Sequence, residues 1–95
     1  MKYIFADNLN TAVFTTRFIL DFHSPILYVY HFKEDGAWQF SGIEDCDEKD
    51  FRIISLEEAV NIDNSILTIA NLPLGYYACR ESKNSEWIIQ KLEDQ

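Results

Sequence analysis

The sequence predicts one small α+β domain with an antiparallel sheet, and three observations support this fold class. The chain has 95 residues, enough for one hydrophobic core and too few for two. Hydrophobic residues make up 47% of the chain and aromatic residues 15%, which is typical of a folded protein. Strand-like segments stand at both ends with helix-like segments between them, and this order favours α+β over regular α/β alternation.

The N-terminal part of the chain predicts a strand followed by a short helical turn. The segment 11–15 is rich in β-branched and aromatic residues, which are typical of strands. Thr15 or Thr16 can then cap a turn of helix. The turn ends before Pro25, because the residue preceding a proline is disfavoured in a helix.

A hairpin is predicted next. The segment 26–32 is apolar on both sides, as in a strand covered on both faces. Asp35-Gly36 predicts a two-residue type I′ turn, and 37–41 is the returning strand. This turn places Lys33 opposite Trp38. The residues predicted to share the core face are Leu27, Val29, His31, Trp38 and Phe40. Those predicted for the other face, under a helix or at the surface, are Tyr28, Tyr30 and Phe32.

The second half predicts two short helices and a second hairpin. After a short extended piece at 51–54, Ser55 and Glu58 have the spacing of a capping box, and Asp63 can cap a second helix. Two strands, at 75–80 and 86–91, flank a polar loop. The predicted sheet therefore consists of two hairpins plus the N-terminal strand, with the two helices between the hairpins. Its core is predicted to include Phe14, Phe18, Tyr28, Trp38, Phe40 and Trp87.

Charge is unevenly distributed along the chain. The formal net charge is −8, and the segment from Glu34 to Asp63 alone holds ten acids and two bases, a sum of −8. This acidity disfavours binding to nucleic acid or to an anionic membrane and favours a basic protein partner. A merely solvated acidic surface is the alternative.

Tyrosines near these acids suit a partner that bears Lys and Arg, through charge pairing and cation–π contacts. The Tyr76-Tyr77 pair and two tyrosines of the first hairpin are the tyrosines expected to be exposed. The predicted partner-binding residues are Tyr28, Tyr30, Glu34, Asp35, Glu44, Asp45, Asp47, Glu48 and Asp50.

Metal, cofactor and catalytic sites are not predicted. His23 and His31 have no partner at a metal-ligand spacing, and an EF-hand loop counted from Asp45 lacks its glycine. Carboxylates around Cys46 should raise its thiol pKa. Cys79 is expected to be a buried thiol within a strand. No metal, no cofactor and no catalytic residue are therefore expected, and a small enzyme that uses Cys79 is a minor alternative.

The sequence gives no strong signal that would direct the chain to a membrane or an oxidising compartment. The longest apolar stretch, 26–30, is far shorter than the ~20 residues that span a bilayer. Neither of the two cysteines has a second cysteine at metal or redox spacing, and both are expected to be reduced, with a disulfide between them as the alternative. We therefore expect a cytoplasmic protein without a membrane partner, either a monomer or a homodimer.

Several motifs occur in an order that resembles a known family. They are Thr15-Thr16, Pro25-Ile-Leu-Tyr-Val-Tyr30, Asp35-Gly-x-Trp38-x-Phe40-x-Gly42 with Glu44, and Ser55-Leu with Asn61-Ile-Asp63-x-Ser65-Ile66. Over residues 12–67 the chain resembles the Imm33-like group of bacterial proteins, a domain of unknown function linked to immunity against polymorphic toxins. The resemblance implies a non-enzymatic protein that binds and blocks one toxin. A housekeeping adaptor or a homodimeric interaction module is the alternative.

Overall fold

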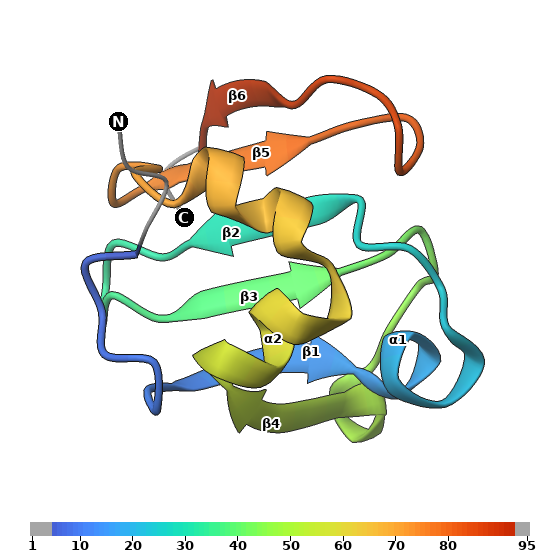
Figure 1. Cartoon of the computed structure of the whole chain (residues 1–95). Coiled ribbons are helices and arrows are strands. Elements are labelled where there is room, and N and C mark those ends of the chain that lie inside the picture. Colours follow the sequence, from blue (N-terminus) through green and yellow to red (C-terminus); the bar gives the residue numbers. More distant parts are fainter. Residues whose placement is uncertain (1–4, 93–95) are drawn as a thin grey trace.

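The computed structural model describes residues 5–92, which form one six-stranded sheet with α2 and η2 against one face (Figure 1). No helix among these residues is long and apolar enough to cross a membrane. The elements are, in order, β1 (Ala12–Thr16), α1 (Arg17–Phe22), β2 (Tyr28–His31), β3 (Trp38–Ser41), the 3-10 helix η1 (Glu48–Asp50), β4 (Phe51–Ser55), α2 (Leu56–Ile62), the 3-10 helix η2 (Asn64–Ile69), β5 (Tyr76–Cys79) and β6 (Ile88–Lys91).

The sheet is mixed, with strand order β4-β1-β3-β2-β5-β6. Both predicted hairpins are present, β2–β3 and β5–β6, and the α+β class is confirmed. The wholly antiparallel sheet is wrong, because β1 runs parallel to β3. The predicted extended piece at 51–54 is in fact a full strand, β4, which pairs antiparallel with β1. Local sequence patterns identify strands without naming their neighbours, and β3 lies between the consecutive strands β1 and β2.

The helices are capped by the side chains that the sequence predicts. The Thr16 hydroxyl accepts the Ile19 N–H at 3.3 Å at the start of α1. The Ser55 hydroxyl accepts the Glu58 N–H at 3.1 Å, while the Glu58 carboxylate accepts the Ser55 N–H at 2.9 Å. This reciprocal capping box confirms the predicted start of α2. Asp63 also caps the following element, which is a 3-10 helix, η2.

The turn between β2 and β3 differs from the prediction. His31 lies opposite Trp38, so the connection is longer than a two-residue turn and Lys33 lies within it. Gly36 alone in the turn has a positive φ, 75°, whereas a type I′ turn also needs a positive φ at Asp35. The register is thus shifted by two residues. Because side chains alternate with a period of two, every predicted face assignment in the hairpin is nevertheless correct.

The core lies between the sheet and the helices. Trp38 and Phe40 are fully buried on this covered face, and the Phe5 ring meets the Trp38 ring edge-on at 4.9 Å. Phe14, predicted for the core, is 39% exposed because it belongs to the opposite face of β1. The buried cluster consists of Phe5, Val13, Ile19, Ile26, Val29, Trp38, Phe40, Leu56, Ala59, Ile66, Ile69, Ala70, Leu72 and Ala78.

A buried ion pair joins η2 to the sheet. The Arg80 guanidinium, 2% exposed, donates to the Asp63 carboxylate at 2.8 Å and to the Ile26 carbonyl at 2.9 and 3.1 Å. It also lies over the Trp87 ring, 4.0 Å from its centroid. Burial alone would raise the pKa of Asp63, but hydrogen bonds from Ser65 and Arg80 outweigh it and hold this pKa below its usual value.

Candidate protein-binding surface

An aromatic ladder lies on the open face of the sheet, the face that α2 and η2 do not cover. Tyr28, Tyr30 and Phe32 alternate along β2 and its extension, so all three point to this face. Their rings are nearly parallel, with centroids 6.3 and 5.7 Å apart along the row. Tyr77 of β5 lies opposite Tyr30, and these rings stack at 5.5 Å. We use the name aromatic ladder for these four residues.

The ladder residues are only partly buried, because they shelter one another without a helix above them. Burial, together with the neighbouring Tyr28 and Tyr77, raises the pKa of Tyr30 above its usual value. The adjacent Tyr76 alternates to the covered face and packs against the core, so the prediction that the Tyr76-Tyr77 pair is exposed is wrong for Tyr76.

Exposed aliphatic and aromatic side chains extend the open face toward both edges. Phe14 and Ile53 pair across β1 and β4, with 39% and 67% of their surface exposed. Ile88 of β6 is 55% exposed beyond Cys79. The polar Gln39 lies between Phe14 and Tyr30 on this face. Exposed apolar side chains gathered on one face are typical of a site for a protein partner.

An acidic loop, residues 43–50, follows β3 at one end of the open face. Its last residue, Asp50, accepts the Arg17 guanidinium N–H at 2.8 Å and the Asp47 N–H at 3.1 Å. The hydrogen bond from Arg17 is the main cause that lowers the pKa of Asp50. Near the start of the loop, the Ser24 hydroxyl donates to Glu44 at 2.7 Å. Residues 17–24 therefore hold both ends of the loop.

These contacts separate the predicted acidic residues into those paired within the protein and those exposed to a partner. Asp50 is buried and paired, so it positions the loop and is not available to a partner. Asp45, Asp47 and Glu48 are exposed, and Glu44 is partly buried.

A hollow of about 370 Å³ lies where the ladder meets the acidic loop. It brings together four predicted binding residues, Tyr28, Tyr30, Glu44 and Asp45, so aromatic walls and carboxylates share one concave site. Its lining is Tyr28, Tyr30, Gln39, Ser41, Gly42, Ile43, Glu44, Asp45, Cys46 and Phe51. Phe51 and Ile43 were not predicted as site residues. Phe51 lies at the start of β4, which β1 and β3 separate from β2 in the sheet, so no local pattern in the sequence indicates that Phe51 lines the same hollow as Tyr28.

Two other predicted residues lie elsewhere. Glu34 and Asp35 belong to the β2–β3 turn, at the opposite end of these strands from the acidic loop (Figure 1). Asp35 accepts the Ala37 N–H at 3.0 Å and so shapes its own turn. Glu57 and Glu58 lie on α2, on the covered side. The acidic segment of the sequence is therefore not one acidic surface, and its carboxylates that line the hollow beside the ladder are those of Glu44 and Asp45.

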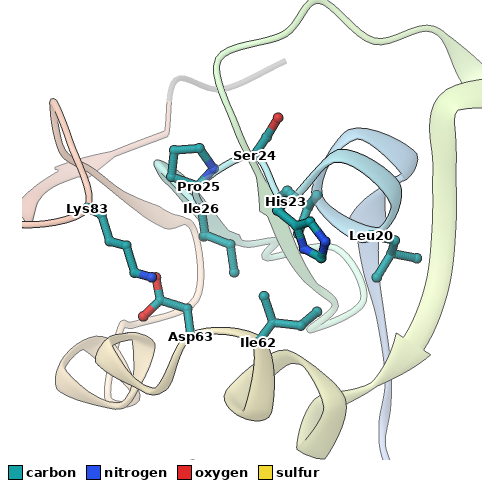
Figure 2. A pocket seen from close by; sticks show the side chains of 9 residues that line it. Leu20, His23, Ser24, Pro25, Ile26, Ile62, Asp63 and Lys83 are labelled. Carbon is teal, nitrogen blue, oxygen red and sulfur yellow. The ribbon is translucent and has the colours of Figure 1, made fainter.

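A second hollow, of about 570 Å³, lies between α1, the end of α2 and the β5–β6 loop (Figure 2). Its walls are largely aliphatic, including Leu20 and Ile62. The side chains of Lys83 and Asp63 point toward each other at one side of it (Figure 2), and Asp63 is already paired with Arg80. None of the predicted partner-binding residues lines this hollow, so it is not the candidate site.

Cys79 and His31 lie on opposite faces of the sheet. Burial and then the carboxylates around it raise the pKa of the Cys46 thiol, as predicted in direction. Cys79 is partly buried on the open face, whereas His31 lies on the covered face, where its Nδ1 is 2.7 Å from the Leu72 carbonyl oxygen. Within residues 5–92, no group of three His, Cys, Asp or Glu side chains is arranged to hold a metal ion.

No protein-family model, curated protein or solved structure matches this chain. The resemblance to bacterial immunity proteins therefore stays a prediction. The candidate site rests on its own geometry: an aromatic ladder, an anchored acidic loop and the hollow between them.

Proposed function

We propose that the protein is a non-enzymatic binding domain that recognises a basic protein partner through the aromatic ladder and the acidic loop. The observation that supports this most is the hollow in which Tyr28 and Tyr30 meet Glu44 and Asp45. Tyrosine rings provide contact area and π faces for Lys or Arg side chains, while the carboxylates provide charge pairing. The two chemistries complement a partner whose surface combines basic and apolar residues.

Charge favours a different protein over a second copy at this site. The ladder and the acidic loop are adjacent, so two copies that met face to face would bring two acidic loops together. The net charge of −8 adds to this repulsion, which also disfavours nucleic acid. A basic partner instead gains from the same charges, and its association is accelerated at low ionic strength.

The partner class we propose is a bacterial toxin domain, on the resemblance to immunity proteins. An acidic surface beside exposed tyrosines suits a basic nuclease toxin, because such a surface mimics the phosphate backbone that the toxin binds. The protein would then act by occupying the toxin's active site, without chemistry of its own.

Calorimetric titration against purified toxin domains encoded beside its gene tests this proposal. We expect binding that weakens as salt concentration rises. Tyr30→Ala should reduce affinity by roughly 30-fold, as expected for an aromatic residue at the centre of an interface. Asp45→Lys should reduce affinity and remove part of the salt dependence.

Matched controls lie away from the site. Ile62→Ala removes an exposed apolar side chain from α2, and Glu81→Lys makes the same charge change in the β5–β6 loop. Both should bind like the natural protein. Absence of binding to every neighbouring toxin, or equal losses in the control variants, would overturn the proposal.

A further inference from the structure

The two edges of the sheet differ in whether their outward backbone groups are occupied. Edge strands expose N–H and C=O groups that can pair with another strand. At the β4 edge, the Leu56 N–H donates to the Thr11 carbonyl at 2.8 Å, so Leu56 faces β1. Backbone groups alternate in direction along an antiparallel strand, and Phe51, Ile53 and Ser55 therefore face outward.

At the β4 edge, side chains form hydrogen bonds to outward backbone groups. The Phe51 carbonyl accepts the Arg52 guanidinium at 2.9 Å, and the Ser55 N–H donates to the Glu58 carboxylate at 2.9 Å. Within residues 5–92, no hydrogen bond occupies the outward backbone groups of Ile53, between them. This edge is therefore poorly suited to receive a further strand.

The β6 edge lacks such contacts. The Leu92 N–H donates to the Gly75 carbonyl at 2.8 Å across β5 and β6, so Leu92, Gln90 and Ile88 face β5. The backbone groups of Ile89 and Lys91 consequently face outward. No hydrogen bond within residues 5–92 occupies these outward groups. All four residues of β6 are exposed, including Ile89 at 50%.

We propose that β6 pairs antiparallel with β6 of a second copy, about a two-fold axis at Ile89. In this register the N–H and C=O groups of Ile89 bond to those of Ile89 in the other copy. Lys91 lies opposite Trp87, and Ile88 lies opposite Gln90. The contact thus pairs the Ile89 side chains of the two copies, satisfies the outward backbone groups and brings no two lysines together. Such a self-complementary contact is the form that a two-fold dimer requires.

Charge also favours a second copy at this edge. Residues 64–92 hold three bases, Arg80, Lys83 and Lys91, and two acids, Glu81 and Glu86, so this part of the chain is nearly neutral. The acidic loop leads into β4, at the far edge of the sheet. Two copies joined at β6 keep their acidic loops apart and leave both aromatic ladders free. The pair would present two binding sites on one continuous open face.

Sedimentation equilibrium of the full chain tests this inference. The contact is short, so we expect a weak dimer, with a mass that rises from 11.1 kDa toward twice that value between about 1 μM and about 1 mM. Ile89→Lys places like charges on the two-fold axis and should weaken dimerisation at least ~10-fold. Ile89→Pro removes an outward N–H without touching the bonds to β5, and should act in the same direction.

Ile53→Lys and Ile53→Pro make the same changes at the β4 edge and should leave dimerisation unaltered. Circular dichroism confirms that each variant is folded before its mass is compared. A constant mass of 11.1 kDa for the natural protein overturns the inference. Dimerisation that survives both Ile89 variants, or that is lost in the Ile53 variants, also overturns it. Toxin binding by folded Ile89→Lys should be unchanged, which separates this result from that of the proposed function.

Discussion

The two faces of the sheet use aromatic residues in opposite ways. On the covered face, Trp38 and Phe40 are 1% and 0% exposed beneath the helices. On the open face, Tyr30 of β2 and Phe14 of β1 belong to the two strands that flank β3, yet they face away from every helix that covers the core. Aromatic content and strand alternation are thus similar on both faces. What differs is the layer above them, and this difference separates a core from a surface available to a partner.

The prediction with the largest expected effect compares two phenylalanines, one on each face of the sheet. Phe40→Ala should lower the free energy of unfolding by about 3–5 kcal/mol, because it leaves a cavity in a fully buried cluster. Phe14→Ala should cost about 1 kcal/mol or less, since that ring is already partly in water. Urea denaturation measures both. Equal losses would mean that the open face is a second core and not an available surface.

The second prediction concerns the buried ion pair on the covered side. Asp63→Asn should cost about 3 kcal/mol, because the buried Arg80 guanidinium loses its counter-charge while the amide keeps one acceptor. Since the pKa of folded Asp63 is lowered, its stabilisation is complete above the unfolded value, about 4, and is lost as the pH falls below it. Thermal unfolding across this range should show a smaller pH dependence in the variant. An unchanged pH dependence would assign the acid sensitivity to other carboxylates.

Local signals explain how much of the fold was predictable. The Ser55–Glu58 capping box, the Thr16 cap and the alternation along β2 and β3 depend on residues close in sequence, and all are confirmed. The parallel pairing of β1 with β3 joins segments more than twenty residues apart, and no local pattern specifies it. The prediction that Phe14 belongs to the core was also wrong, because burial there depends on whether a helix covers that face of the strand.

The parts of the candidate site could likewise be predicted from the sequence, but their arrangement could not. Tyr28 and Tyr30 share a face by alternation, and the acidity at 44–48 is visible in composition. That these two features meet at one hollow depends on the path of the loop after β3. Asp50 shows most clearly what could not be predicted from the sequence. Its carboxylate pairs with Arg17, 33 residues away, and therefore holds the loop in place instead of facing a partner. Glu34 and Asp35 are close to Tyr30 in sequence, but a turn at the other end of the strands separates them from the loop.

A smaller effect is expected at Gly42, which joins the open face to the acidic loop. A Cβ at this position would lie 2.8 Å from Glu44 Oε1 and 3.0 Å from the Pro25 carbonyl oxygen. Gly42→Ala should therefore displace the Glu44 side chain from Ser24, at a cost of about 1–2 kcal/mol. Partner affinity should fall as well, because Glu44 lines the hollow.

Gly36→Ala is the control for this variant. Its positive φ of 75° makes alanine unfavourable there by a comparable amount, of order 1 kcal/mol. The turn lies at the far end of the strands, so partner affinity should be unchanged. If both glycine variants bind equally well, the hollow contributes nothing to recognition and the ladder alone forms the site.

The smallest expected effect concerns the external anchor of the acidic loop. The Arg17 side chain is 38% exposed, so its pairing with Asp50 is partly screened by water and Arg17→Ala should leave the protein folded. The clearer change is in the pKa of Asp50, which should rise toward its ordinary value because the hydrogen bond from Arg17 is the main cause of its depression. Carboxyl chemical shifts followed by NMR titration measure this directly.

Linkage adds a second, independent measurement. A lowered pKa gives stabilisation that is present above the ordinary value near 3.8 and lost as the pH falls, so the natural protein and Arg17→Ala should converge in stability in acid. Arg52→Ala is the control, because the Arg52 guanidinium donates to the backbone carbonyls of Lys49 and Phe51 and not to a carboxylate of the described residues. If the pKa of Asp50 stays low in Arg17→Ala, the Asp47 N–H holds that carboxylate instead. The acidic loop would then be a self-contained unit, and its position beside the ladder would depend on Glu44 and Ser24 alone.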